Sequence, residues 1–412
     1  MIPADWEAVT LGSIGKFKNG INKPKQAFGS GHPFVNLMDV FGVSNIEATD
    51  HLGLIESNDM DRSMYDLKMG DVLFIRSSVK PSGVGLTTVI AQDLPRTVYS
   101  GFLLRFRDQR QLTTGFKEHC FHDERFRARI IANSTVSANT NINQSALKAL
   151  VIGYPPTTTE QSAIAEALSD VDRGIAAVEA VIAKKRALKT ATMQALLSGT
   201  RRLPGFSGEW ERFSFGQRFQ FLRNGSSARA ALSATGAIGY IHYGDIHSAP
   251  RPYMDCGNGA LPRISRDLVI GLPRIQNGDL LIADASEDYE GTGKSVEATS
   301  ISDDEVVAGL HTLLLRPMEK MAPGFVGYLR FIPEVKSQFV SAAQGVSVYG
   351  LSRSAVKSVE FSIPKYEEQE AIASILSDME IDLSDHKSKL TKLRHLKTGM
   401  MQQLLTGKIR LI

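Results

Sequence analysis

The feature that most constrains this chain is a long segment that occurs twice. Residues 160–203 align without a gap with residues 368–411, and 20 of the 44 aligned positions are identical. Composition alone would give about one identity in fifteen positions. The two segments are therefore a duplication, and we expect both copies to form the same structure.

Each copy has the periodicity of one long helix. Apolar residues recur at alternating intervals of four and three, which is typical of a helix that packs along a narrow seam against another helix. The other copy is the obvious partner, and about 40 residues would form a helix of roughly 60 Å. The residues predicted to pack the helix pair are Ile164, Leu168, Val171, Ile175, Val178, Ile182, Ile372, Leu376, Met379, Leu383, His386, Leu390 and Leu393.

The ends of both helices carry recognisable signals, and the seam has two irregular positions. Thr157 with Glu160 fits a capping box, and glycines close both copies. His386 is aligned with Val178 of the first copy, and Lys185 of the first copy is aligned with Leu393. Polar residues in such a seam tend to specify register, so we expect the two helices not to be interchangeable.

The duplication continues outside the helices. Residues 116–154 align without a gap with residues 325–363, the segment 68–73 matches 276–281, and a Trp-Glu pair begins each half. The predicted fold class is α+β, with two globular α/β parts that alternate with two long helices in a tandem repeat of pseudo-twofold symmetry. The predicted domains are a globular part at 1–154, a helical region at 155–203, a globular part at 204–362 and a helical region at 363–412.

Each globular part is predicted to combine short strands with one helix. A Gly-Asp turn precedes an apolar run in both halves, and β-rich runs follow later. The expected strands are Val72–Ile75, Phe102–Phe106, Leu280–Ile282 and Thr312–Leu315, and the expected helices are Phe116–Ile131 and Phe325–Val340.

The loops of the two halves differ far more than their helices. RSSVKPSGVGLTTVI follows the first Gly-Asp turn, whereas the matching stretch of the second half reads ADASEDYEGTGKSVEA. Loops on a rigid frame are where recognition residues usually lie. We therefore expect one architecture that presents two different recognition surfaces.

Composition leaves a soluble protein as the default. Hydrophobic residues make up 42% of the 412 residues, and the formal charge of +3 is only mildly basic. A nucleic-acid surface would therefore have to be a local patch. The N-terminus lacks the pattern of a signal peptide and no run approaches 18 apolar residues, so we expect a cytoplasmic protein with no membrane partner. Cys120 and Cys256 suggest neither a disulfide framework nor a zinc site.

Several loop residues could donate hydrogen bonds to phosphates or base edges. A charged loop residue is usually just solvated, but as a set these residues fit a DNA-facing surface better than an enzyme pocket. The candidate DNA-binding residues are Lys18, Asn19, Lys23, Lys25, Arg76, Ser77, Ser78, Lys80, Arg223, Asn224, Ser226, Arg229, Lys294, Tyr349 and Arg353.

Other motifs are weak, and we predict neither catalytic nor metal-binding residues. Residues 291–295 resemble the end of a phosphate-binding loop, but Asp288 replaces the required glycine and no clear helix follows. His119 and His122 lack the further ligands that a metal site needs. Pro155 and Pro156 follow a tyrosine and do not form an adenine-methyltransferase motif.

The ordered duplication resembles the specificity subunit of type I restriction-modification systems over essentially the whole chain. The residues that carry the resemblance are Pro156, Glu160-Gln161, Ala163-Ile164-Ala165, Leu168-Ser169-Asp170, Leu188-Lys189-Thr190, Met193-Gln194, Leu196-Leu197 and Gly199, with their counterparts from Pro364 to Gly407.

This resemblance implies two target recognition domains, each of which reads half of a bipartite sequence in double-stranded DNA. The helices would pair antiparallel, set the spacer and dock two methylation subunits, and restriction subunits would join the full complex. S-adenosylmethionine, ATP and Mg²⁺ would be bound by those partners, so this chain would not be catalytic by itself. The alternatives are a coiled-coil adaptor that binds proteins, which would show no salt-dependent DNA affinity, and a nucleotide-dependent enzyme built around residues 291–295.

Overall fold

The computed structural model describes residues 3–257, 261–301, 305–345 and 347–411. The chain forms two compact units, one of Met1–Glu179 with Lys389–Ile412 and the other of Ala180–Ser388. Each unit combines one globular part with a portion of both long helices. The domain limits that we expected from sequence remain a prediction, because these units cut through the helices.

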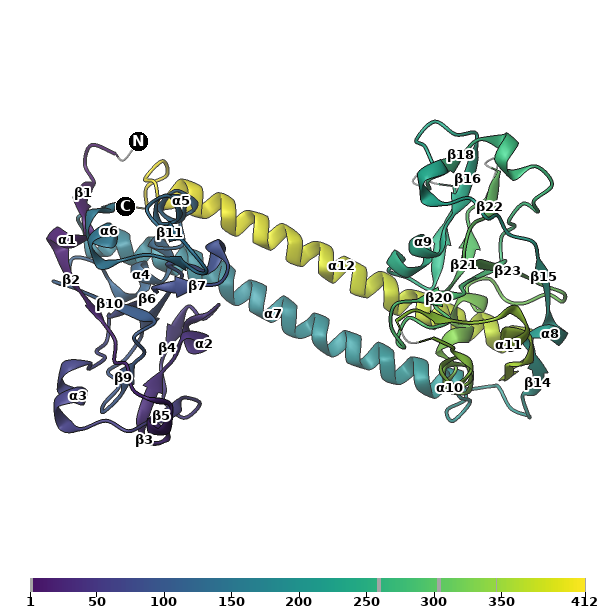
Figure 1. The fold of residues 1–412 in the computed structure, drawn as a ribbon, viewed down its shortest axis with the longest axis horizontal. Coiled ribbons are helices and arrows are strands. Elements are labelled where there is room, and N and C mark those ends of the chain that lie inside the picture. Colours follow the sequence, from purple (N-terminus) through teal and green to yellow (C-terminus); the bar gives the residue numbers. More distant parts are fainter. Residues whose placement is uncertain (1–2, 258–260, 302–304, 346, 412) are drawn as a thin grey trace. The chain divides into compact units, whose positions relative to one another are not determined.

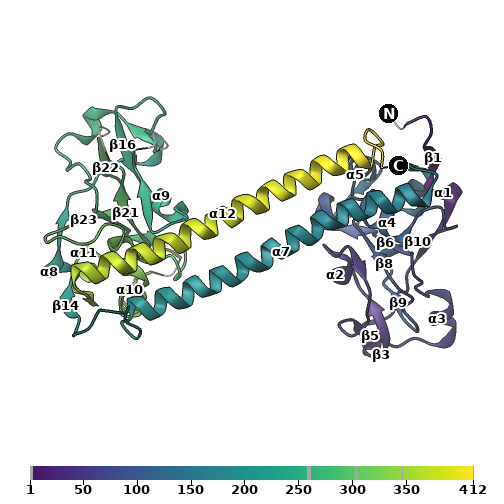
Figure 2. The same cartoon turned by 180° about the vertical axis from the view of Figure 1, so that it is seen from behind.

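The two predicted long helices are α7 (Thr158–Leu197) and α12 (Tyr366–Leu404). In the first unit they run side by side (Figures 1 and 2), and ion pairs join Asp172 to Lys397 at 2.6 Å and Glu179 to Arg394 at 2.7 Å. In the second unit Lys185 of α7 pairs with Asp382 of α12 at 2.5 Å. Lys189 pairs with Glu380 in the same unit. In each unit the partner's number falls as the residue number along α7 rises, so the helices pack antiparallel. The predicted α+β class with an antiparallel helix pair is confirmed.

Every predicted seam residue is buried or half-buried. Ile164 and Leu168 belong to the core of the first globular part, and Ile372 and Leu376 belong to that of the second. The beginning of each helix therefore packs on its own globular part as well as on the other helix. Leu396, an apolar residue off the seam, is exposed.

The first globular part is built on a five-stranded sheet in the order β2-β10-β6-β8-β4. Its central strand β6 is apolar throughout because residues of alternating direction enter two cores: Val72 and Phe74 pack toward the long helices, and Leu73 and Ile75 pack on the other face. The strands are β2 (Gly15–Asn19), β4 (Asn45–Ile46), β6 (Val72–Ile75), β8 (Thr87–Ile90) and β10 (Leu103–Asp108).

Smaller elements surround this sheet. Strands β1 (Glu7–Thr10) and β13 (Val151–Tyr154) pair, β5 (Gly53–Ile55), β3 (Phe28–Val35) and β9 (Val98–Tyr99) form a three-stranded sheet, and β11 (Thr135–Val136), β12 (Thr140–Asn141) and β7 (Ser77–Ser78) form another. The helices are α1 (Leu11–Ile14), α2 (Leu37–Val40), α3 (Asp59–Met64), α4 (Thr114–Cys120), α5 (Glu124–Ala132) and α6 (Gln144–Ala149), with 3₁₀ turns η1 (Lys25–Ala27) and η2 (Pro81–Gly83).

The second globular part repeats the plan. Its five-stranded sheet has the order β15-β23-β19-β21-β17, and its edge strand is parallel to its neighbour, as in the first part. These strands are β15 (Phe219–Leu222), β17 (Tyr253–Asp255), β19 (Leu280–Ala283), β21 (Ser295–Thr299) and β23 (Thr312–Pro317).

The remaining elements of the second part also fall into small sheets and short helices. The pairs are β14 (Glu211–Ser214) with β25 (Glu360–Ile363) and β20 (Ala285–Ser286) with β24 (Tyr349–Gly350), and β18 (Arg263–Ile264), β16 (Ile238–Ile241) and β22 (Val306–Ala308) form a sheet. The helices are α8 (Phe215–Arg218), α9 (Tyr243–Ser248), α10 (Pro333–Ala342) and α11 (Arg353–Ser358), with 3₁₀ turns η3 (Arg229–Ala231), η4 (Arg266–Val269) and η5 (Val326–Phe331).

The single helix that we predicted in each globular part is broken in two. In the first part the chain leaves α4 after Cys120, and the side chain of Asp123 accepts hydrogen bonds from the first amides of α5. In the second part Pro333 begins α10 after the turn η5, because proline fits the first turn of a helix but not its interior. Apolar periodicity alone does not reveal these restarts.

A salt-bridged clasp joins the start of each long helix to the segment that follows the end of the other. Glu160, at the start of α7, accepts two hydrogen bonds from Arg410, and Glu368, at the start of α12, accepts two from Arg202. Both glutamates are only 2% exposed. Each arginine also lies over a tryptophan ring, Trp6 in the first unit and Trp210 in the second. The clasp explains why the Trp, Glu and Arg positions recur in both halves.

The packing of the seam generates a stability prediction. Leu168 is fully buried in the first unit, so Leu168→Ala should lower the free energy of unfolding by roughly 2–5 kcal/mol through lost apolar contact and a residual cavity. Leu396→Ala, in the same unit but 52% exposed, should cost less than about 1 kcal/mol. Urea unfolding followed by circular dichroism measures both, and equal losses for the two variants would contradict the seam assignment.

Candidate nucleic-acid interface

In the first unit, several candidate donors meet at one end of the central sheet. Asn19 ends β2, Arg76 follows β6, and β7, which contains Ser77, pairs with β12. Gln144, at the start of α6, donates a hydrogen bond of 2.8 Å to the side-chain oxygen of Asn19. We call this region, made of the ends of β2 and β6, the β7·β12 pair and the start of α6, the strand-end surface of the first unit.

The second unit has the same surface, built from the matching elements. Asn224 follows β15, β20 pairs with β24, and Arg353 begins α11. Arg353 donates to the carbonyl of Leu222 at 2.9 Å and to the side-chain oxygen of Asn224 at 3.4 Å. The Gln144–Asn19 contact of the first unit therefore has a direct counterpart here. This region, with the start of α11, is the strand-end surface of the second unit.

The other candidates of the first unit lie in different surroundings. Lys18 lies on β2 with its amine 5.3 Å from the centre of the Tyr65 ring. Lys23 is ion-paired with Asp61 at 2.7 Å, next to the sheet β5-β3-β9. Lys25 is exposed in η1, which places it with Lys23 rather than with the strand-end surface.

Several candidates of the second unit are already engaged within the chain. Arg229 forms an ion pair with Asp245 at 2.7 Å. The amine of Lys294 donates to the carbonyl of His247, and partial burial lowers the pKa of that amine. Arg223 and Ser226 are exposed beside Asn224.

Gln144 belongs to this surface but was not among the candidate residues, although the duplication carried a signal for it. The ungapped alignment of residues 116–154 with 325–363 places Gln144 opposite Arg353, which was a candidate. It also places Thr140 opposite Tyr349. Comparing the two halves position by position would have found both.

The loops that follow β7 and β20 share one framework. Gly85 and Gly293 have φ of 64° and 67°, and a Cβ at these positions would lie 2.5 Å from Ile130 and 2.3 Å from Phe339, two side chains that are equivalent in the repeat. Gly293 therefore belongs to packing that recurs in the first unit. The segment after it is strand β21 rather than a helix, and a phosphate-binding loop requires a helix there.

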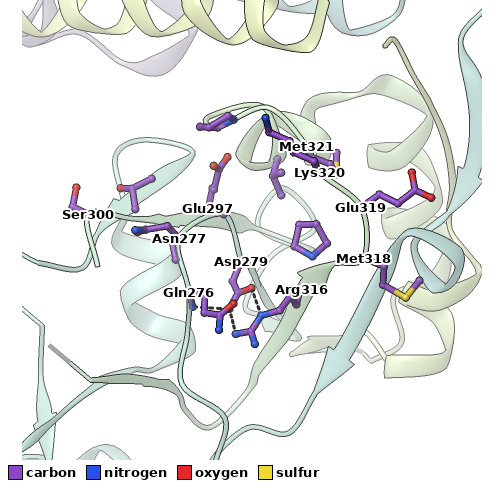
Figure 3. A pocket seen from close by; sticks show the side chains of 16 residues that line it. Gln276, Asn277, Asp279, Glu297, Ser300, Arg316, Met318, Glu319, Lys320 and Met321 are labelled. Atoms are coloured by element: carbon purple, nitrogen blue, oxygen red, sulfur yellow. Dashed lines mark hydrogen bonds and ion pairs between the residues drawn. The ribbon is translucent and has the colours of Figure 1, made fainter. Parts of the chain in front are cut away.

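The opposite end of each central sheet holds the Gly-Asp turn. A hollow of about 550 Å³ lies there in the second unit. Figure 3 shows two of the residues that line it, Arg316 and Asp279, and Arg316 donates to both carboxylate oxygens of Asp279. The equivalent pair in the first unit is Arg107 with Asp71, and both aspartates are 1% exposed. These pairs hold the turn that starts the central strand of each unit, so the Gly-Asp motif that occurs in both halves has a structural role.

A family model described as type I restriction modification DNA specificity domain matches residues 3–185. Over 99% of its length the chain is also 25% identical to a protein of Methanocaldococcus jannaschii, covering 95% of it, that bears the name type I restriction enzyme MjaX specificity subunit. Residues 3–185 therefore match the DNA specificity domain of type I restriction-modification systems, and the whole chain is similar to a specificity subunit. The resemblance drawn from its sequence is thereby confirmed.

Solved structures of specificity subunits share the fold. The S subunit of M. genitalium is 16% identical, with a TM-score of 0.55 over 98% of this chain and 96% of that one. The HsdS subunit of Thermoanaerobacter tengcongensis is 15% identical, with a TM-score of 0.52 over 99% and 98%. A structure concerned with complex assembly and conformational transition of the type I R-M system is 14% identical, with a TM-score of 0.62 over 99% and 100%.

Metal-binding groups, membrane-spanning helices and cysteine thiols bear on the alternative functions. Among the described residues, no group of three or more His, Cys, Asp or Glu side chains could hold a metal ion. Within the same residues, no helix is both long and apolar enough to cross a membrane. Cys120 and Cys256 are buried, and burial raises the pKa of both thiols.

His119 and His122 instead pack inside the first unit. The Nε2 atom of His119 lies 3.0 Å from the hydroxyl of Ser169 on α7, and that of His122 lies 3.2 Å from the hydroxyl of Thr87. Burial lowers the pKa of each imidazole from 6.5 to about 4. Asp172 opposes this lowering for His119, whereas Lys397 reinforces it for both rings.

The two histidines should make the first unit sensitive to acid. The unfolded chain takes up protons near pH 6.5 and the folded one only near pH 4, so stability is complete above pH 6.5 and is lost as the pH falls toward 4. His119→Gln with His122→Gln should remove up to roughly 3 kcal/mol of this pH dependence for each ring. Urea unfolding at pH 7.5 and 4.5 tests it, with the exposed His395→Gln as control; a double variant with the pH dependence of wild type would refute the assignment.

Proposed function

We propose that each unit reads one half of a bipartite DNA sequence through its strand-end surface. The chain would thereby give a type I restriction-modification complex its sequence specificity without being catalytic itself. The observation that carries this proposal is the contrast between a repeated frame and unlike side chains. The Asn19–Gln144 and Asn224–Arg353 contacts occupy equivalent places but present different donors.

The chemistry of these side chains suits the two tasks of DNA binding. Phosphate contacts supply affinity without sequence information, and hydrogen bonds to base edges supply discrimination. Within the described residues, the guanidinium groups of Arg76 and Arg223 form no side-chain hydrogen bond or ion pair, so they could bind phosphates or guanine edges. Asn19, Ser77 and Ser78 could both donate and accept at base edges.

The long helices would set the number of unread base pairs between the half-sites and dock two methylation subunits. An antiparallel pair stiffened by ion pairs such as Asp172–Lys397 and Lys185–Asp382 is a suitable spacer. In this proposal the methylation subunits bind S-adenosylmethionine, the restriction subunits bind ATP, and Mg²⁺ is also held outside this chain. The complex would act in the cytoplasm, where the host DNA lies.

Exchange of one unit's recognition surface tests whether the two units recognise their half-sites independently. Replacing residues 1–150 by the corresponding part of a divergent specificity subunit should change one half of the methylated sequence and leave the other half and the gap unchanged, because the second surface is intact. Sequencing of modified bases in host DNA, after co-expression with the methylation subunit, measures this. A change in both halves would contradict independent reading.

Shortening the helix pair tests the spacer. Deleting residues 180–183 of α7 together with residues 387–390 of α12 removes about one turn from each helix, or about 6 Å. The gap between half-sites should shorten by about one to two base pairs of 3.4 Å each, and the half-sites should stay the same. The matched control deletes nothing and replaces Val181 and Ile182 by alanine, since Ala180 and Ala183 are alanine already. Altered half-sites with an unchanged gap would exclude a spacer role.

A further inference from the structure

The loops that follow β7 and β20 differ most at their tips. In the first unit the tip is Val79 to Ser82, and in the second it is Glu287 to Glu290. Val79 is 81% exposed and Tyr289 is 53% exposed, so each tip exposes a large hydrophobic side chain to solvent. The frame beneath is the same, because the two glycines of each loop recur at equivalent positions.

The second tip is held in one conformation by its own hydrogen bonds. The hydroxyl of Ser286 donates to the carbonyl of Asp288 at 2.8 Å, and the carboxylate of Asp288 accepts from the amide of Gly291 at 2.6 Å. A Cβ on Gly291 would lie 2.4 Å from the Ser286 hydroxyl, so the loop can close this way only with glycine. A rigid loop loses little conformational entropy when its tip binds.

Tyr289 is braced by a second aromatic ring. Its ring centre lies 4.0 Å from that of Tyr349 on β24, with 33° between the ring planes. Tyr349 pairs with Ser286 in the β20·β24 sheet, which is part of the strand-end surface. In the first unit the equivalent positions are Pro81 and Thr140, so this aromatic pair belongs to the second unit alone.

The pattern of repetition indicates what the tips contact. A surface that binds two copies of the same partner should have similar residues in both halves, and the long helices do. A surface that reads different sequences must differ, and the tips are basic with Lys80 in the first unit but acidic in the second. Carboxylates repel phosphates, so the acidic tip with Glu287 suits base edges, where a carboxylate can accept from cytosine.

We propose that residues 79–82 and 287–290 enter a groove of the DNA and contact base edges, and that the ring of Tyr289 discriminates one or two base pairs of the second half-site. This inference rests on the proposed function and assigns the specificity of each unit to one loop tip. Tyr349 is a positioning residue that holds the Tyr289 ring against the strand-end surface.

The test maps methylation sites on a randomised DNA library with the complex of this chain and its methylation subunit. Tyr289→Ala should reduce discrimination at one or two base pairs of the second half-site roughly tenfold. The first half-site, the gap and the salt dependence of binding should not change, because no phosphate contact is lost. Tyr289→Phe should retain the wild-type half-site, because it keeps the ring.

A reciprocal variant tests the first tip. Replacing residues 79–82 by the residues of the second tip (V79E/K80D/P81Y/S82E) should alter only the first half-site. The matched controls are Met69→Ala and Met318→Ala, which remove exposed apolar side chains at the opposite end of each central sheet. Both controls should leave the two half-sites as in wild type.

The outcomes separate the two proposals. If wild type methylates a bipartite site and Tyr289→Ala leaves its second half unchanged, the tip assignment is wrong while the proposed function stands. Equal effects of Tyr289→Ala and Met318→Ala on both halves would also overturn the tip assignment. If wild type shows no bipartite site, the proposed function itself fails.

Discussion

The fold depends on the carboxylate–guanidinium clasp between the two halves of the duplication. A glutamate in the first turn of one long helix meets an arginine just beyond the end of the other, so only an antiparallel arrangement can form both clasps. Glu160 also lies at the positive end of the helix dipole, and Arg410 binds it through two parallel hydrogen bonds. The same arginine lowers the pKa of Asp5. The clasp thus ties both helices and the first globular part together in one contact.

The residues that occur in both halves of the chain are those whose burial or pairing the shared fold requires. Asp71 and Asp279 start the central strands, and Gln161 and Gln369 bind backbone groups where each helix leaves its globular part. The divergent loop tips instead expose side chains such as Val79 and Tyr289 to solvent. Two opposite demands, a fixed frame and variable recognition, are therefore met by different residues of the same loops.

The repeat and its period of 3.5 predicted the long helices, their pairing and the central strands, because these features depend on regular spacing and burial. The break between α4 and α5 was missed, since it depends on one capping side chain, Asp123. The candidate site was harder still. Lys294 and Arg353 were chosen as exposed donors, but each binds a backbone carbonyl of its own unit. Composition cannot tell a side chain that faces solvent from one that is committed to the frame.

The first unit is assembled from both ends of the chain. Leu404 and Leu405 lie in its core beside Trp6, and Gly407 packs against the Pro3 and Trp6 side chains. The second unit is one continuous stretch, Ala180–Ser388. On the ribosome, the second unit can therefore close once Ser388 has emerged, whereas the first must wait for the residues after Lys389. A product that stops before Leu404 would leave that core open to proteases and chaperones, so it would not reach assembly.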